Sequence, residues 1–197
     1  MSKSLSENLS VFKETVGEHF QFLVEDYGFS FLGFQTDSGV SCRYESRKVF
    51  IQFHYYPPGF EIDILLGRKG KEDVKEGNPF YFQEVLSFLK KESTCGFMAC
   101  SVDNVKSCIP ILGKLLKEVG DSFLNGVDED YKNLSFYRNA ENNRYAIEQE
   151  LKQTRKLVED AWRDKEYRKV IELFSPLQEW LNPTEVKKLE YARKHIM

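Results

Sequence analysis

The side chains best suited to chemistry fall on one predicted face of a β-sheet. His54 lies in a run of alternating residues, and Glu45, Glu61 and Asp63 take the same face of neighbouring runs. An imidazole within hydrogen-bond reach of a carboxylate can act as a general base, and opposite residues on adjacent strands lie roughly 5 Å apart. Arg43 on this face can bind an anion. Mixed charges at a period of two are also typical of a solvated sheet face, and the pattern favours that interpretation.

No familiar catalytic or cofactor-binding motif accompanies these residues. Three glycines lie close together, at Gly67, Gly70 and Gly77. They do not form a phosphate-binding loop, because Gly70 is followed by Lys71 and then by Glu72, whose carboxylate would repel phosphate. The chain also lacks the Gly-x-Ser-x-Gly and His-Glu-x-x-His motifs and an EF-hand loop. We therefore assign no catalytic residue and no cofactor, and we expect binding rather than catalysis.

The four cysteines do not predict a metal centre. They are Cys42, Cys95, Cys100 and Cys108. They contain no Cys-x-x-Cys pair and no histidine lies near them, whereas structural zinc takes four ligands at short, regular spacings. We expect reduced thiols that pack as small apolar side chains, and we expect no metal site.

Two other segments carry side chains suited to binding a protein. Tyr55, Tyr56 and Phe60 surround the turn Pro57-Pro58-Gly59, and aromatic side chains on a rigid turn make good anchors at an interface. They are equally suited to packing over the end of a sheet. The second segment is the acidic stretch Asp128-Glu129-Asp130. We predict that both segments contact a partner, together with the sheet face that carries His54.

The bulk composition argues against nucleic-acid-binding and membrane proteins. The net charge is -3 and the sequence pI is about 5.8, so the chain lacks the basic surface that neutralises phosphates. No apolar run approaches the roughly 20 residues that span a bilayer. The first eight residues also lack the apolar stretch of a signal peptide. We expect a cytoplasmic protein that binds neither nucleic acid nor a membrane.

The hydrophobic pattern predicts one helix and four strands in the first part of the chain. Apolar residues spaced by three and four run from Leu9 to about Tyr27 and predict the helix. Four runs with a period of two then predict an antiparallel meander. Their apolar positions share a face that the helix covers: Cys42, Tyr44, Ile51, Phe53, Tyr55, Phe60, Ile62 and Ile64. Their polar positions form the other face, which we call the polar sheet face: Arg43, Glu45, Gln52, His54, Glu61 and Asp63.

The remainder of the chain is predicted to be helical. A short helix opens at Pro79, a longer one spans about residues 102–124, and both cover the same sheet face as the first helix. From residue 127 the sequence favours a long polar helix followed by a helical hairpin. The fold class is therefore α+β, with an α+β domain at residues 1–126 and a helical region at residues 127–197.

The segment from Leu151 to Pro183 resembles one tetratricopeptide-type helical hairpin. The resemblance rests on an acidic turn followed by Tyr167 and an aliphatic pair, and on Pro183, which closes the unit. Val170 departs from the repeat pattern, which has a small residue where the helices cross, and the turn lacks glycine. The resemblance covers about one repeat, whereas arrays need about three to bury a continuous core. It implies an antiparallel helical hairpin that serves as a docking element.

The N-terminal part resembles small uncharacterised bacterial α+β proteins, some of them of the toxin-immunity type, which bind and neutralise a toxin. The resemblance rests on the segment from Phe20 to Phe29, on Arg43-Tyr44-Glu45-Ser46 and on Val49-Phe50-Ile51. It covers roughly residues 9–90. These are mainly core positions, so the resemblance implies the fold more than the function and transfers no catalytic residue.

The leading hypothesis from the sequence is a non-enzymatic protein-binding module. Its most concrete form is an immunity-type protein that neutralises a toxin by steric and electrostatic occlusion. Two alternatives stay open. One is an enzyme that uses His54 with a carboxylate of the polar sheet face, which would require a shifted pKa of the imidazole. The other is a structural protein that self-associates through its C-terminal helices.

Overall fold

The structure is a computed structural model that describes residues 3–37, 39–56, 59–70 and 79–196, with the backbone alone for residues 3–5. The chain divides into two compact units, Met1–Tyr137 and Arg138–Met197, each with its own hydrophobic core. We call them the N-terminal unit and the C-terminal unit. The first combines a sheet with helices and the second is helical, which confirms the α+β class and the helical C-terminal part.

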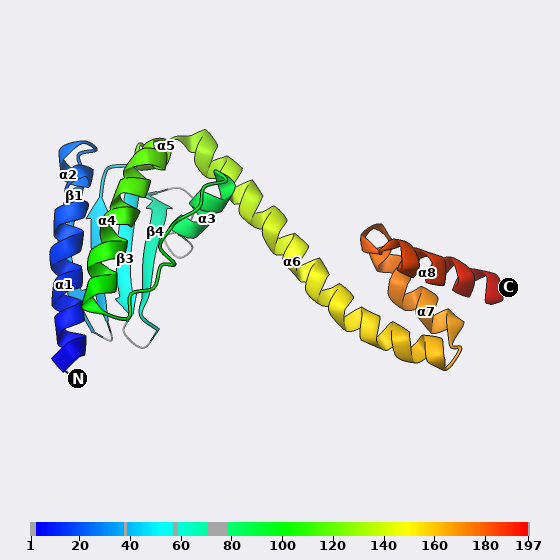
Figure 1. The fold of residues 1–197 in the computed structure, drawn as a ribbon. Coiled ribbons are helices and arrows are strands. Elements are labelled where there is room, and N and C mark those ends of the chain that lie inside the picture. The colour runs from blue at the N-terminus through cyan, green and yellow to red at the C-terminus, as the bar shows by residue number, and fades with distance from the viewer. Residues whose placement is uncertain (1–2, 38, 57–58, 71–78, 197) are drawn as a thin grey trace. The chain divides into compact units, whose positions relative to one another are not determined.

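The N-terminal unit is built on an antiparallel sheet of five strands in the order β1-β2-β3-β4-β5 (Figure 1). The strands are β1 (Ser30–Thr36), β2 (Val40–Glu45), β3 (Val49–Tyr56), β4 (Glu61–Arg68) and β5 (Phe80–Tyr81). The prediction of four strands is wrong, because β5 was not recognised. It has two residues, too few to show an alternation, and it runs directly into a helix.

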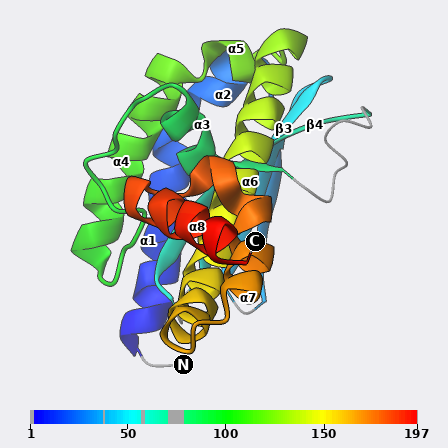
Figure 2. The same ribbon diagram turned by 90° about the vertical axis from the view of Figure 1, so that its right-hand side faces the viewer.

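Two long helices cover the buried face of this sheet. The helices of the N-terminal unit are α1 (Lys3–His19), α2 (Phe22–Glu25), α3 (Phe82–Phe88), α4 (Val102–Val119) and α5 (Asp121–Leu124). Burial alternates along β2 as the sequence predicts. Figure 1 and Figure 2 show α1 and α4 on the same side of the strands. The two helices approach closely at Gly113, where an added Cβ would lie 2.9 Å from the carbonyl oxygen of His19.

One end of the sheet is tied to the start of helix α6 (Asp128–Arg163). Gly126 follows α5 with a φ of 66°, and an added Cβ there would lie 2.9 Å from Cγ2 of Val49. The left-handed conformation and the close approach both require glycine. Arg68, at the end of β4, is buried on the helix-covered face. Its guanidinium pairs with Asp128 and lies over the ring of Tyr131, with Cζ 5.4 Å from the ring centroid.

The C-terminal unit packs three α-helices around a small core. It contains α6 from Arg138 onward, α7 (Tyr167–Phe174), the 3-10 helix η2 (Ser175–Trp180) and α8 (Pro183–His195). The buried core residues are Val158, Ala161, Val170, Phe174, Leu189 and Ala192. Asn182 caps α8, because its side chain accepts hydrogen bonds from the backbone N–H groups of Thr184 and Glu185. The carboxylate of Glu185 also accepts a bond from Arg155, which ties α8 to α6.

Candidate functional site

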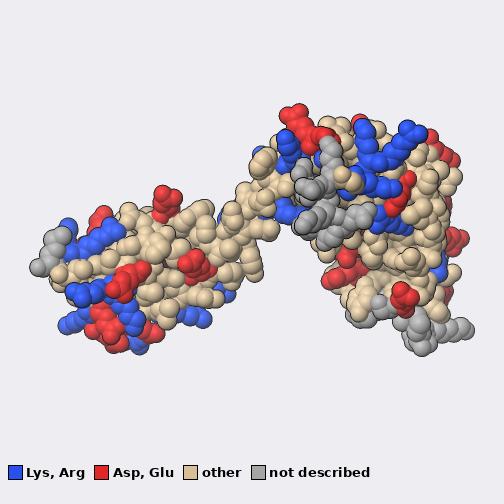
Figure 3. All heavy atoms as spheres, turned by 180° about the vertical axis from the view of Figure 1, so that it is seen from behind, with Lys and Arg blue, Asp and Glu red and all other residues tan. Residues whose placement is uncertain are grey.

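The polar sheet face points its side chains away from α1 and α4. Because those helices lie in front of the sheet in Figure 1, Figure 3 shows the opposite face from behind. The register determines which side chains are neighbours. Opposite pairs are Ser41 and His54, Arg43 and Gln52, Glu45 and Phe50, His54 and Asp63, and Tyr56 and Glu61. The face therefore divides into a part around Glu45 and a part around His54.

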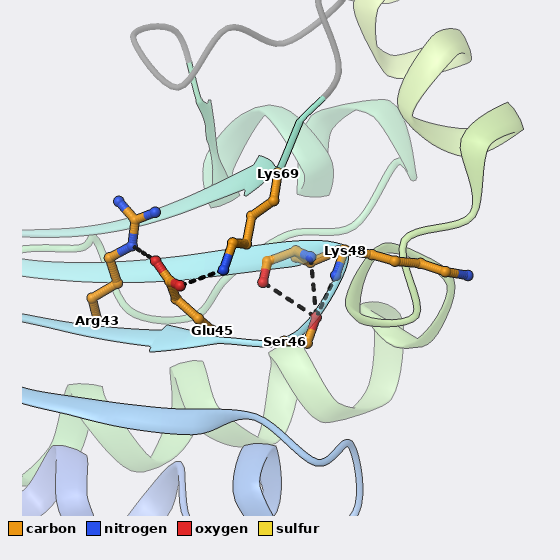
Figure 4. A network of polar contacts seen from close by, with 6 residues as sticks. Arg43, Glu45, Ser46, Lys48 and Lys69 are labelled. Carbon is orange, nitrogen blue, oxygen red and sulfur yellow. Dashed lines mark hydrogen bonds and ion pairs between the residues drawn. The ribbon is translucent and has the colours of Figure 1, made fainter.

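An ion-pair network occupies the part around Glu45 (Figure 4). Arg43 Nε lies 2.6 Å from one carboxylate oxygen of Glu45, and Lys69 Nζ lies 2.6 Å from the other. The hydrogen bond from Lys69 lowers the pKa of Glu45 although burial opposes it, and the charge of Arg43 adds to the lowering. Because both of its oxygens are engaged, Glu45 is not the carboxylate that orients His54.

A buried aromatic ring lies beneath this network. Phe50 points to the polar sheet face, yet its exposed fraction is 1%. The guanidinium of Arg43 lies over the ring, with Cζ 4.0 Å from the centroid. Across the ring, an added Cβ on Gly67 would lie 2.1 Å from Cζ of Phe50. Arg43 is thus held between Glu45 and Phe50, where it shields the ring from water.

The part around His54 is polar and hollow. A pocket of about 290 Å³ lies beside the imidazole. Its lining includes Gln35, Asp37, Ser41, Gln52 and Tyr56. Partial burial lowers the pKa of His54, and the carboxylate of Asp63 opposes that shift. Burial raises the pKa of Asp63, as does the neighbouring Glu61. The imidazole is therefore neutral at pH 7 and can both donate and accept a hydrogen bond.

The strand register places Asp63 directly opposite His54, but the two side chains are not hydrogen-bonded within the described residues. Within the described part of the chain, no hydrogen bond or ion pair links His54 to Asp63 or to Ser41. A general base works through a hydrogen bond to the proton it removes, and its orienting partner must lie within similar reach. The arrangement offers polar groups to a ligand without an assembled catalytic pair.

The structure places Tyr55 in the core, which corrects its prediction as a partner contact. Its hydroxyl donates a hydrogen bond to the carbonyl oxygen of Ala99 at 2.6 Å, and its ring stacks on Phe12 with the centroids 5.2 Å apart. Tyr55 is one of the buried positions that alternate along β3, so its side chain points toward the helices. Tyr55 therefore stabilises the fold.

The other two aromatics of the predicted hairpin tip differ in exposure. Phe60 is half-buried and packs against the core, with a φ of 53°. Tyr56 is 48% exposed at the end of β3, beside the His54 pocket. Pro57 and Pro58, which complete the predicted turn, lie outside the described residues. Tyr56 is thus the accessible aromatic of the three.

The acidic stretch at the start of α6 is only partly available to a partner. Asp128 pairs with the buried guanidinium of Arg68, so its charge is used within the fold. Glu129 is exposed and Asp130 is half-buried. Carboxylates in the first turn also stabilise a helix, because they face the positive end of its dipole. The stretch therefore has a structural role at its first residue.

The cysteines and the long helices offer no further site. Among the residues that the structure describes, no group of three or more His, Cys, Asp or Glu side chains can hold a metal ion. Cys42 and Cys108 are buried, which raises the pKa of each thiol to about 12, so neither forms a thiolate at neutral pH. In the described ranges, no helix combines the length and apolar character needed to cross a bilayer.

Sequence reasoning missed three residues of this face: Ser41, Phe50 and Lys69. Ser41 shares the alternation of β2 with Arg43, so the period of two was sufficient to place it. Phe50 lies on the same face of β3 as His54. Its burial there could not be predicted, because it depends on Arg43 from the neighbouring strand. Lys69 follows the last residue of β4, where no alternation fixes a side-chain direction.

The chain was compared with protein-family models, with curated proteins and with solved structures. None of the three comparisons finds a match. The functional interpretation consequently rests on the surfaces and contacts of this chain, above all on the polar sheet face and its pocket beside His54.

Proposed function

We propose that this protein is a non-enzymatic protein-binding module that uses the His54 part of the polar sheet face. One observation carries the proposal: the exposed ring of Tyr56 stands beside a polar pocket of about 290 Å³ on a sheet face that points away from α1 and α4. An exposed aromatic next to a hollow is typical of the centre of an interface. A rigid antiparallel sheet holds both in place.

The charge around this pocket indicates the chemistry of the partner. Asp37 lines the pocket, and Asp63 and Glu61 lie on the strand next to His54. We expect a partner that inserts a basic side chain into the pocket while Tyr56 packs against its surface. The most concrete form of this function is immunity-type neutralisation of a toxin by occlusion, a proposal supported by the resemblance of the N-terminal sequence to such proteins.

The proposal is tested by capturing partners from the source cells with three tagged proteins: wild type, Tyr56→Ala and Tyr145→Ala. Tyr145 is an exposed tyrosine of α6 and serves as the matched control. We expect a stoichiometric protein that wild type and Tyr145→Ala retain and that Tyr56→Ala binds at least about tenfold more weakly, as for an interface hot spot. Equal capture by all three proteins, or no partner, would contradict the proposal.

A second candidate function is an enzyme in which His54 acts as a general base. One observation favours it: Ser41, His54 and Asp63 occupy directly opposite positions on three adjacent strands. A hydroxyl, an imidazole and a carboxylate in this order can activate a serine nucleophile. The row would need to tighten on substrate binding, since its members are not hydrogen-bonded within the described structure.

This candidate is tested with a fluorophosphonate, which labels activated serines. We expect labelling at Ser41 that disappears in His54→Ala, while a circular dichroism melt shows that the variant remains folded. If wild type is not labelled, or if His54→Ala is labelled at the same rate, His54 does not activate Ser41 and the enzymatic proposal fails.

A further inference from the structure

A second pocket lies at the end of the sheet where the chain enters α6. It has a volume of about 400 Å³ and opens between the β2–β3 turn, the end of β4 and the segment before α6. Its lining includes Arg47, Lys48, Arg68, Lys69 and Asp128. Four cationic side chains and one carboxylate give a formal charge of +3, although the whole chain carries -3. Figure 3 shows Lys and Arg side chains gathered on the N-terminal unit.

The backbone around this pocket is fixed by contacts between its three walls. The N–H of Lys69 donates to the carbonyl oxygen of Lys48 at 2.8 Å, which joins β4 to the β2–β3 turn. The hydroxyl of Ser46 accepts from the N–H groups of Lys48 and Val49 and closes that turn (Figure 4). Gly126 packs against Lys48 and Val49: a Cβ added to it would lie 3.0 Å from Cβ of Lys48 and 2.9 Å from Cγ2 of Val49. A ligand would therefore meet a preformed site.

The four cations differ in how free they are. Arg68 is 5% exposed and is paired with Asp128, so it holds the wall in place. Lys69 shares its charge with Glu45. Arg47 and Lys48 are exposed and have no anionic partner among the described residues, and Lys48 extends away from the network in Figure 4. Within the described residues, the pocket thus has two cations without an anionic partner, with the ammonium of Lys69 beside them.

We propose that this pocket binds the polyphosphate group of a small molecule. Two free cations and a third that can be shared suit adjacent phosphates, because each phosphate is stabilised by charge-assisted hydrogen bonds. The amides of α6 contribute little, since Asp128, Glu129 and Asp130 already face that helix end. Nucleic acid is disfavoured: the lining has no aromatic side chain on which a base could stack, and the chain is acidic overall.

The test is calorimetric titration of the full chain with inorganic tripolyphosphate at low salt. We expect saturable binding that weakens at least about tenfold in Arg47→Glu and in Lys48→Glu, and that also weakens as sodium chloride is added. Lys106→Glu is the matched control, because Lys106 is an exposed lysine near the beginning of α4, at the end remote from α5. We expect it to bind as wild type does. Thermal melts verify that all variants are folded.

Three outcomes would overturn this proposal: no binding by wild type, equal weakening in Lys106→Glu, or binding of single-stranded RNA without binding of tripolyphosphate. A parallel titration with ADP separates two sources of the same chemistry. Tighter binding of ADP indicates a nucleotide, and equal or weaker binding indicates a free polyphosphate; both support the site. The inference is independent of the proposed protein partner, since Tyr56→Ala leaves this pocket intact and is expected to bind tripolyphosphate normally.

Discussion

At the scale of single residues, Gly67 determines how the polar sheet face is packed. Its missing side chain makes room for the ring of Phe50, which Arg43 then covers. An alanine Cβ at residue 67 would lie 2.1 Å from Cζ of Phe50, a distance that only displacement of the ring or of the strand can relieve. The face thus combines a buried aromatic with an outer layer of ion pairs.

We predict that Gly67→Ala destabilises the N-terminal unit by about 1–3 kcal/mol, the usual cost of overpacking a well-packed site. Urea denaturation followed by the amide signals of β3 measures the change. Gly96→Ala is the control, because no atom lies within 4 Å of the Cβ that it would add. Equal midpoints for the two variants would show that the contact with Phe50 does not constrain the fold.

His54 makes the stability of the N-terminal unit depend on pH. Burial lowers its pKa in the folded state below the value of about 6.5 that the unfolded chain has. The unfolded state therefore takes up a proton first as the pH falls. The contribution of neutral His54 to stability is fully present above the unfolded-state pKa. It is lost as the pH falls from that value towards the lower folded-state pKa. Asp63 has the opposite sign, because its pKa is raised and its stabilising effect is lost as pH rises.

We predict that His54→Gln reduces the loss of stability between pH 7.5 and pH 5.5, the range in which a histidine of the unfolded chain takes up its proton. The free energy of unfolding of wild type and variant is measured across that window. As the pH falls, the free energy of unfolding should decrease less in the variant than in wild type. A constant difference would mean that His54 titrates alike in the folded and unfolded states.

At the scale of elements, an ion pair helps to attach the start of α6 to the sheet. Asp128 lies in the first turn of the helix, and its partner Arg68 is buried on the helix-covered face. We predict that Asp128→Asn destabilises the N-terminal unit by about 1–3 kcal/mol, because the guanidinium stays buried without its counter-charge. Glu129→Gln, an exposed neighbour, should cost less than about 0.5 kcal/mol. Denaturant titrations compare the two, and equal costs would rule out this attachment.

Alternation was sufficient to predict β2, β3 and β4 with their faces, but not the contacts between them, and burial along β1 does not alternate. Tyr55 follows the alternation of the buried face, which already placed it beneath the helix, and its burial agrees with that alternation and not with a contact at the turn. Arg68 is also one of the alternating buried positions of β4. A charged residue is stable there because Asp128 and Tyr131, from a segment distant in the sequence, contact its guanidinium. Likewise, the row of Ser41, His54 and Asp63 depends on register, which turn lengths set and composition does not.

At the scale of the whole molecule, the two units have separate cores with no shared buried residue among those described. The start of α6 contributes Tyr131 and Leu134 to the N-terminal core, and its later part contributes Val158 and Ala161 to the C-terminal core. The two tryptophans, Trp162 and Trp180, both belong to the C-terminal unit. Tryptophan fluorescence therefore reports on that unit alone, and amide signals of β3 report on the other.

We predict that the two units unfold in separate transitions, which core substitutions shift one at a time. Phe174→Ala empties a fully buried site of the C-terminal core and should lower its stability by about 3–5 kcal/mol, moving the fluorescence midpoint to lower urea. Phe53→Ala does the same to the N-terminal core and should move the β3 amide signals instead. If either substitution moves both probes together, the units stabilise each other and the chain unfolds as one cooperative structure.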